Sequence, residues 1–464
     1  MPHRLTLAQM AEEIRSGRLS PLELIEAHLK HIREHNPALN AFVRVLADEA
    51  VDQARRASEK RSSETGPLHG IPVTIKDSFD MAGLPTTCGS RFFAQLRAAR
   101  DSTAVARFKA AGAIPIGKTN CPEFLLNYET DNNVIGRTNN PWNLECTPGG
   151  SSGGESAAIS SFCSAGGIGS DGGGSVRVPA HFCGIAGLKP TPGRVSAAGH
   201  LPEICHPGGL LGVAGPMART AEDVRMLFET LAGYDSQDPF SAPVPLQKPE
   251  VDGVRIGYMP QFYKVPVQPA ISRALDNAAA CLRDLGFAVE TFEPKGLERA
   301  PNVWWFFFGE LPARVTQELI AGREDQAHWT GTEFLKRALE EPEPTSKDVL
   351  NNLAIRDKMR SALLREMERM PVILTPACGT TAFHHRQRRY DTAAKEIGLF
   401  EAMMPATFVN LLGLPGLTIP FGQDENGMPA GIQLVGRPYD EELLLEIAVR
   451  MEKARGPFPA PPGF

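Results

Sequence analysis

Two serine clusters flanked by glycine carry the side chains best suited to covalent chemistry. They read PGGSSGGESAA over residues 148–158 and GSDGGGSVRVPA over residues 169–180. Small neighbours allow main-chain N–H groups to point into a pocket, as an oxyanion hole requires. A serine in such a place is a candidate nucleophile, provided that another group accepts its proton. The candidate N–H donors are those of Gly172, Gly173, Gly174 and Ser175.

Lys76 is the candidate for the group that accepts this proton. The 11 histidines are scattered, and His69 and His181 are expected to be structural. Residues 71–76 alternate between apolar and other side chains, which predicts a strand that ends at Lys76. Burial lowers the pKa of a lysine and so favours the neutral form that a base needs. Composition alone favours a plainer interpretation, in which a glycine-rich structural loop lies beside an ordinary surface lysine.

The stretch from Gly112 to Thr119, GAIPIGKT, fits the pattern of a phosphate-binding loop. Such a loop must present its main-chain N–H groups to phosphate. The apolar middle, Ala-Ile-Pro-Ile, instead predicts a strand that enters the core. A nucleotide-binding protein therefore remains only as an unfavoured alternative.

Two further glycine patterns carry little weight. Residues 167–172 fit G-x-G-x-x-G, but a dinucleotide site needs a helix there, and Pro179 follows seven residues later. Residues 149–153 fit G-x-S-x-G, but a nucleophile elbow needs a strand before its serine, and residues 143–148 are turn-like. An ordinary α/β-hydrolase is therefore not expected.

Helices and strands alternate along the chain, which indicates one α/β body. The first long helix begins with the capping box Ser20-Pro21-Leu22-Glu23 and ends at Asn36-Pro37. Residues 139–193 are expected to be mostly loop with short strands. Other expected helices cover residues 47–60, 271–285, 346–370 and 441–454, and other strands cover 113–116, 254–258, 288–292, 372–375, 417–420 and 431–435.

The 464 residues are expected to form a single domain, 1–464. A proline-rich linker runs from Pro239 to Pro249. Residues 240–345, which begin in this linker, are expected to be a variable insertion or lid near the active site.

Charge and cysteine usage limit the classes of partner. The net charge is −6, with 48 basic and 54 acidic residues and no long run of either sign. This argues against nucleic acid or an anionic membrane as the main partner. The eight cysteines are scattered, no His/Cys cluster has zinc spacing, and the N-terminus lacks an apolar signal region. Reduced thiols, a cytoplasmic location, no metal and no membrane span are expected.

The chain resembles the amidase signature family over nearly its whole length. The two serine clusters belong to the matching segments. The others read PLHGIPVTIKD (67–77), GKTNCPEF (117–124), NPWN (140–143), AHFCGIAGLKPTPGRVS (180–196), GPMART (215–220) and GIQLVGRPYDE (431–441).

The resemblance implies a large mixed β-sheet flanked by helices on both faces. It also implies a Ser–cis-Ser–Lys triad, in which Ser175 is the nucleophile, Ser151 follows a cis peptide bond and bridges, and Lys76 is the base. Asp171 and Arg177 would brace the nucleophile loop, and Ser152 would support the site. No cofactor would be needed. The activity implied is hydrolysis of linear amides, with carbamates and esters as further substrates.

Two positions bear on which member of the family this chain resembles. Gly172 stands where the family usually has Thr or Ile, so a looser loop or a roomier pocket is expected. Glu155 is more typical of stand-alone members of the fatty-acid-amide-hydrolase and acetamidase type. The chain is expected to resemble such stand-alone amidases, including aryl acylamidases, and to act as a monomer or homodimer. The A subunit of a tRNA-dependent amidotransferase, which would need partner subunits, remains the alternative.

An aromatic run, Trp304-Trp305-Phe306-Phe307-Phe308, lies in the variable region. A buried helical turn is the more common role for such a run. If it lines the substrate channel instead, Trp304, Trp305 and Phe307 are the candidate contacts and the substrate is apolar or aromatic.

Overall fold

The computed structural model describes residues 1–60, 65–205 and 211–464. The helices are α1 (Leu7–Arg15), α2 (Pro21–Leu39), α3 (Ala47–Ser58), α4 (Thr103–Ala110), α5 (Gly153–Ser160), α6 (Arg177–Cys183), α7 (Ala221–Leu231), α8 (Pro269–Asp284), α9 (Ala300–Trp305), α10 (Leu311–Ile320), α11 (Trp329–Leu339), α12 (Ser346–Met367), α13 (Leu399–Leu411) and α14 (Glu441–Arg455). The strands are β1 (Phe42–Val45), β2 (Pro72–Lys76), β3 (Ile114–Thr119), β4 (Gly166–Asp171), β5 (Ala186–Lys189), β6 (Val213–Ala218), β7 (Arg255–Tyr258), β8 (Ala288–Thr291), β9 (Val372–Pro376), β10 (Arg389–Asp391), β11 (Glu396–Gly398), β12 (Gly416–Gln423) and β13 (Pro429–Gly436).

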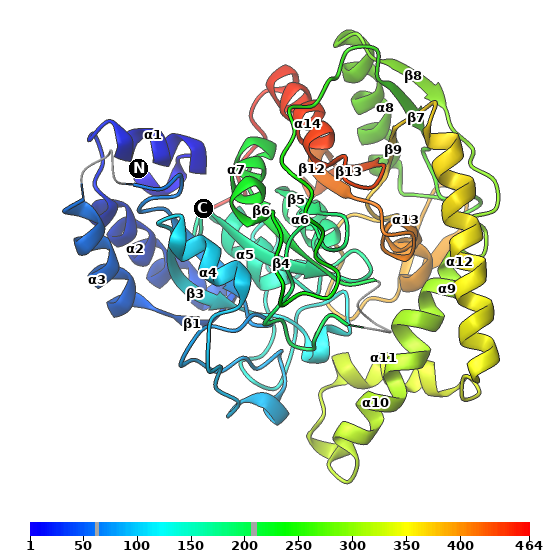
Figure 1. Cartoon of the computed structure of the whole chain (residues 1–464), viewed down its shortest axis with the longest axis horizontal. Coiled ribbons are helices and arrows are strands. Elements are labelled where there is room, and N and C mark those ends of the chain that lie inside the picture. Colours follow the sequence, from blue (N-terminus) through cyan, green and yellow to red (C-terminus); the bar gives the residue numbers. More distant parts are fainter. Residues whose placement is uncertain (61–64, 206–210) are drawn as a thin grey trace.

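Most of these strands form one large mixed sheet. Among the described residues, 11 strands lie in the order β1-β3-β2-β4-β6-β5-β12-β13-β9-β7-β8 (Figure 1). Strand β2 pairs in parallel with both β3 and β4, whereas β4 and β6 are antiparallel. The central hairpin β12–β13 is antiparallel, and β7 is parallel to both β8 and β9. The predicted mixed α/β sheet is therefore confirmed.

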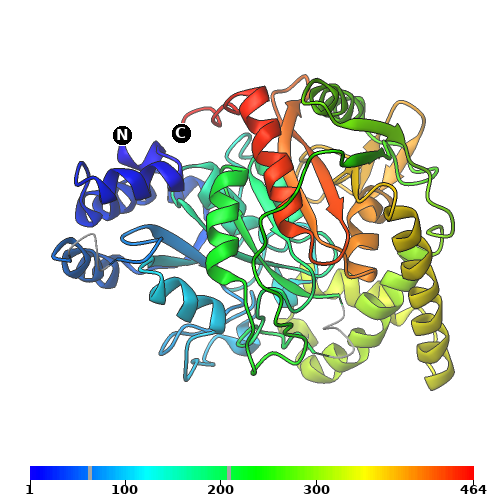
Figure 2. The same cartoon turned by 45° about the horizontal axis from the view of Figure 1, so that its top comes forward.

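Helices cover both faces of this sheet, as predicted. Ile432 and Leu434 of β13 belong to a core cluster that also contains residues of α7, α8 and α14. Gln433 points to the opposite face because side chains alternate along a strand, and there it accepts a hydrogen bond from Arg177 of α6. Figure 2 shows α7 (green) and α14 (red) side by side in front of the sheet.

The first long helix confirms its predicted start and corrects its predicted end. Ser20 and Glu23 form the capping box at the start of α2. The helix does not stop at Asn36-Pro37 but includes Pro37 and continues to Leu39. Asn40 ends it by adopting the left-handed conformation, with its N–H bonded to the Asn36 carbonyl.

Residues 139–193 contain more regular structure than the sequence indicated. The short helices α5 and α6 lie there, and every residue of both is buried. A helix buried on all sides has no polar face, so its sequence lacks the apolar periodicity by which helices are recognised. The sequence therefore did not predict these two helices, although most residues of the segment lie outside helices and strands, as expected.

The expected insertion, residues 240–345, divides into two structural parts. Strands β7 and β8 join the edge of the main sheet, and α8 packs on β12 and β13. The helices α9, α10 and α11 follow and lie together at the lower right of Figure 1, with α12 along the right edge. Trp304 and Phe308 of this second part lie against the second serine cluster, and the role of the part as a lid stays a prediction.

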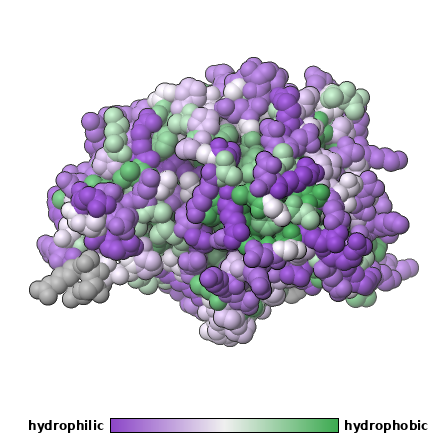
Figure 3. All heavy atoms as spheres, turned by 90° about the horizontal axis from the view of Figure 1, so that it is seen from above, coloured by the Kyte–Doolittle hydropathy of each residue, from purple (hydrophilic) through white to green (hydrophobic). Residues whose placement is uncertain are grey.

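The face of the molecule drawn in Figure 3 is largely hydrophilic. Figure 3 shows one face on which apolar atoms gather in a patch surrounded by hydrophilic ones. No helix in the described part of the chain is long and apolar enough to cross a membrane. All eight cysteines are free, and only Cys205 is exposed.

Candidate active site

Lys76 lies at the end of β2, as predicted, and its side chain is fully buried. Its Nζ donates hydrogen bonds to Ser151 Oγ at 2.7 Å, Ser152 Oγ at 3.0 Å and Ser170 Oγ at 3.0 Å. Burial lowers the pKa of this lysine to about 8. About a tenth of the amine is therefore neutral at pH 7, which makes the neutral form that a general base requires accessible.

The neighbouring carboxylate does not pair with Lys76. Asp77 points to the other side of the strand, where its Oδ1 lies 2.7 Å from the Nζ of Lys118. Lys118 belongs to β3, a fully buried strand, and donates to the Pro85 carbonyl. The stretch from Gly112 to Thr119 thus contains a core strand, as its apolar middle predicted, and its lysine is ion-paired.

The first serine cluster packs tightly against two other segments, the chain at Asn127 and the turn that carries Ser175. The Gly150–Ser151 peptide bond is cis, as expected. A side chain at Gly150 would meet the Asn127 carbonyl oxygen at 2.5 Å, so the chain at Asn127 packs directly on this turn. Ser152 donates its main-chain N–H to the Ser175 carbonyl at 3.1 Å. This bond joins the two serine clusters.

The second serine cluster is the turn between β4 and α6, and it is held by a buried ion pair. Arg177 donates to both carboxylate oxygens of Asp171, at 2.9 and 3.0 Å, and neither side chain is exposed. Asp171 also accepts from the N–H groups of Gly174 at 2.7 Å and Val176 at 3.0 Å. Asp171 and Arg177 therefore brace the turn that carries Ser175.

Several bonds keep this ion pair charged and in place. Burial alone would raise the pKa of the Asp171 carboxyl, but the Arg177 guanidinium and main-chain N–H groups hold it well below its usual range. Asn410 donates to the Asp171 carbonyl at 2.9 Å, and Gln433 accepts from Arg177 at 2.6 Å. No sequence pattern indicated Asn410, because it lies 239 residues away in an apolar helix.

The main chain of residues 172–175 offers fewer oxyanion donors than expected. The N–H of Gly174 is taken by Asp171, so the candidate set loses this member. The carbonyls of Gly172 and Gly173 accept from Trp304 Nε1 at 2.9 Å and from the Tyr128 hydroxyl at 2.8 Å. The N–H groups of Gly172, Gly173 and Ser175 make no hydrogen bond to another residue that the structure describes.

Two rings of the aromatic run lie against this turn. A side chain at Gly173 would clash with Trp304, and one at Gly172 would meet Phe308 at 2.6 Å. The roomier pocket expected from Gly172 is therefore wrong, since Phe308 fills the space. Trp305 is half-buried beside Phe334 and Phe400.

Phe307, the remaining candidate contact, is placed elsewhere. It is almost fully buried in the hydrophobic core beside Phe306. It therefore faces the core rather than the serines. Phe308, rather than Phe307, lies against the glycine turn.

Glu155 is a buried carboxyl near Lys76. It accepts hydrogen bonds from Thr74 at 2.5 Å and from Thr119 at 2.6 Å. Burial raises its pKa to about 7, although these bonds and the charge of Lys76 oppose the rise. The carboxylate form of Glu155 favours the charged form of Lys76.

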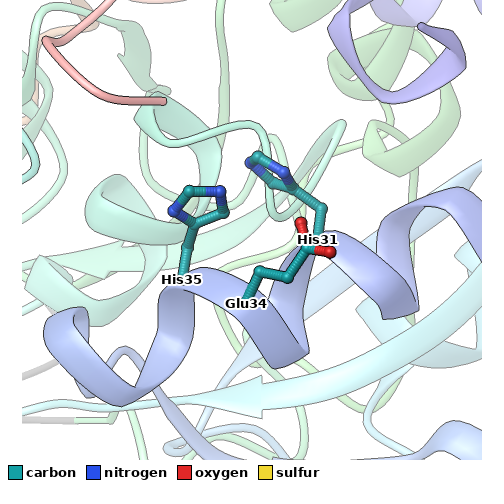
Figure 4. Close-up of side chains that lie close together, drawn as sticks. All are labelled: His31, Glu34 and His35. Atoms are coloured by element: carbon teal, nitrogen blue, oxygen red, sulfur yellow. The ribbon is translucent and has the colours of Figure 1, made fainter.

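Three side chains that could bind a metal ion lie on α2. Ligand atoms of His31, Glu34 and His35 lie within 4.8 Å of one another, on one side of the helix (Figure 4). His31 Nε2 lies 2.7 Å from the Ser161 carbonyl, and its ring stacks on that of His3 and lies at a tilt of 47° to that of His35. The expectation that no histidine cluster has zinc spacing is therefore wrong for residues 31–35. These residues contribute no group to the site around Lys76.

Comparison with known proteins places the chain among amidases and related enzymes. It is 34% identical to the A subunit of the glutamyl-tRNA(Gln) amidotransferase of Methylococcus capsulatus, covering 97% of each chain. A bacterial aryl acylamidase of the amidase signature family superposes with a TM-score of 0.88 at 26% identity, covering 98% of this chain and 96% of that one. A chain from a vestigial protein complex, described as revealing the origins of an s-triazine catabolic enzyme, gives 0.90 at 26% identity, with 98% and 100% covered.

The sequence match and the fold agree with the geometry of the serine clusters. The profile of the amidase family matches residues 23–445. The chain therefore belongs to the amidase signature family of enzymes.

Proposed function

We propose that this protein is a serine hydrolase that cleaves the C–N bond of linear amides. The observation that carries this proposal is the position of Lys76, fully buried and hydrogen-bonded to three serine hydroxyls. A buried lysine with hydroxyl rather than carboxylate partners can be neutral and can exchange protons with them. Ser175 is the proposed nucleophile, Ser151 the bridging hydroxyl and Lys76 the base.

The reaction follows from these roles. Neutral Lys76 accepts a proton through Ser151 while Ser175 Oγ attacks the carbonyl carbon of the amide. The N–H groups of Gly172, Gly173 and Ser175 are the donors proposed to stabilise the oxyanion. The relay then protonates the leaving amine, and water hydrolyses the acyl-enzyme with Lys76 again as base. Every proton in this scheme is transferred by groups of the protein or by water.

Aryl or acyl amides are the proposed substrates, with carbamates and esters as further ones. The rings of Trp304 and Phe308 beside the glycine turn support an apolar substrate. The aryl acylamidase that shares the fold acts on a substrate of this kind by its name. A monomer or homodimer acting alone is proposed.

The test is turnover by the purified chain. A panel of chromogenic anilides, esters and carbamates should give measurable hydrolysis without any added subunit. The Ser175→Ala variant should lose activity by about 10⁴-fold or more, as other nucleophile deletions do. Hydrolysis that survives in this variant would refute the proposed chemistry.

A second candidate function is the A subunit of a tRNA-dependent amidotransferase. The 34% identity to such a subunit over 97% of each chain favours it. That role would need partner subunits. If the purified chain is inactive on every simple amide but gains glutaminase activity with partner subunits, this second function replaces the first.

A further inference from the structure

We infer that Phe308 and Gly172 form one specificity-determining unit, which selects substrates with an uncharged aromatic group next to the scissile amide. This inference rests on the proposed function and names the substrate class that the site prefers. Neither residue is part of the proposed proton relay. The unit is assembled from the nucleophile turn and the helical segment after α9.

The ring of Phe308 lies where Gly172 lacks a side chain. A Cβ at residue 172 would meet three atoms of this ring, at 2.6, 3.3 and 3.6 Å. Any larger residue at position 172 would therefore have to displace the ring. The position of the Phe308 ring thus requires glycine at residue 172. The ring forms the surface that a side chain at residue 172 would otherwise form.

The ring cannot move aside easily, because its neighbour is fixed to the same turn. Phe308 stacks on Trp304 with ring centres 4.8 Å apart and an angle of 15°. Trp304 is buried and donates Nε1 to the Gly172 carbonyl at 2.9 Å. Each of the three residues Gly172, Trp304 and Phe308 therefore contacts the other two.

The local helix geometry separates Phe308 from the core residue next to it. Residues Phe306–Glu310 form a π-helical turn directly after α9. Such wide turns are frequent at functional sites. Phe307 faces the core, whereas Phe308 stays half-buried on the side of Trp304 and the glycine turn.

The surroundings of Phe308 are aromatic rather than charged. Phe334 lies edge-on to it with ring centres 6.4 Å apart, and Trp305 and Phe400 extend the group of rings. The guanidinium of Arg337, an exposed residue, lies 3.9 Å over the Phe400 ring and 5.2 Å over the Trp305 ring. Aromatic surfaces favour flat apolar groups, which stack on them or meet them edge to face. A substrate with an uncharged aryl group fits this surface.

The main experiment measures kcat/KM for matched pairs of substrates. One pair, benzoyl and butyryl 4-nitroanilide, differs only in the acyl group; the other, acetanilide and N-butylacetamide, differs only in the amine. Phe308→Ala should lower the aryl-to-alkyl ratio about tenfold in at least one pair, because it removes one stacking surface. An unchanged ratio in both pairs would overturn the inference.

The coupling between the two residues is tested by rescue. Gly172→Thr should lose most activity on all substrates, since its Cβ overlaps the Phe308 ring. Adding Phe308→Ala should make room and restore at least about tenfold of the lost activity toward the alkyl substrates. A double variant no more active than Gly172→Thr would contradict the proposed unit.

Two controls separate this outcome from unfolding and from failure of the proposed function. Phe307→Ala should lower the melting temperature without changing the aryl-to-alkyl ratio, because Phe307 faces the core. A fluorophosphonate that labels Ser175 reports on the nucleophile independently of substrate choice. Labelling of Ser175 together with an unchanged aryl-to-alkyl ratio would contradict only the specificity unit. Absence of labelling at Ser175 in the wild-type protein would contradict the proposed function.

Discussion

Lys76 Nζ lies 2.7 Å from Ser151 Oγ, and the peptide bond that precedes Ser151 is cis. The same amine also bonds to Ser152 and Ser170, so its hydrogen-bond partners are all hydroxyl groups. This arrangement links a buried amine to both serine clusters, since Ser170 belongs to the second. The bond from the Ser152 N–H to the Ser175 carbonyl connects the first cluster to the nucleophile turn.

The activity should depend on pH through Lys76. Its pKa is about 8, and the proposed base is the deprotonated form. The rate should therefore rise with pH, reach half its maximum near pH 8 and level off above about pH 9. The measurement is kcat/KM against pH for an uncharged anilide. A rate that falls as pH rises from 6 to 9 would contradict the role of neutral Lys76.

Arginine should not replace Lys76. The Lys76→Arg variant keeps a positive charge but cannot lose its proton, so it should be as inactive as Lys76→Ala. Lys118→Arg is a matched control, because Lys118 is a buried lysine paired with Asp77 and bonded to none of the serines. Its rate–pH midpoint should not move. Substantial turnover by Lys76→Arg would make this residue an electrostatic anchor rather than a base.

Removal of the Glu155 charge should shift the rate–pH midpoint to lower pH. The Glu155 carboxylate favours the charged form of Lys76, so Glu155→Gln lowers the pKa of the amine further. The amide of Gln can still bond to Thr74 and Thr119. Glu129→Gln provides a comparison at a buried carboxylate that pairs with Arg388 instead. A midpoint that moves equally in both variants would show that the effect is not local.

Breaking the Asp171–Arg177 ion pair should strongly destabilise the fold. Asp171→Asn leaves the buried guanidinium without its counter-charge, which costs about 3–5 kcal/mol in the free energy of unfolding. Urea unfolding measures this loss. The double variant Asp171→Asn/Arg177→Met should lose less stability than the sum of the single variants, because it leaves no unpaired charge. Additive losses would mean that the two residues act independently.

The sequence was informative where a local pattern determines the structure. The alternation over residues 71–76 predicted β2 with Lys76 at its end, and the glycine-rich clusters indicated both serine turns. The sequence could not indicate that the Gly174 N–H donates to Asp171 and so is not available to an oxyanion, because that bond depends on how the turn closes. Nor could it show which rings of the aromatic run face the glycines, since this depends on the π-helical turn at Phe306–Glu310.

The central claim, that Ser175 is the nucleophile, is tested most directly by covalent labelling. The wild-type protein is treated with a fluorophosphonate, digested, and the modified serine is located by mass spectrometry. We expect an adduct on Ser175 that forms faster as pH rises through about 8, and that is absent in Ser175→Ala. An adduct on Ser151 or another serine, with Ser175 unmodified, would contradict it.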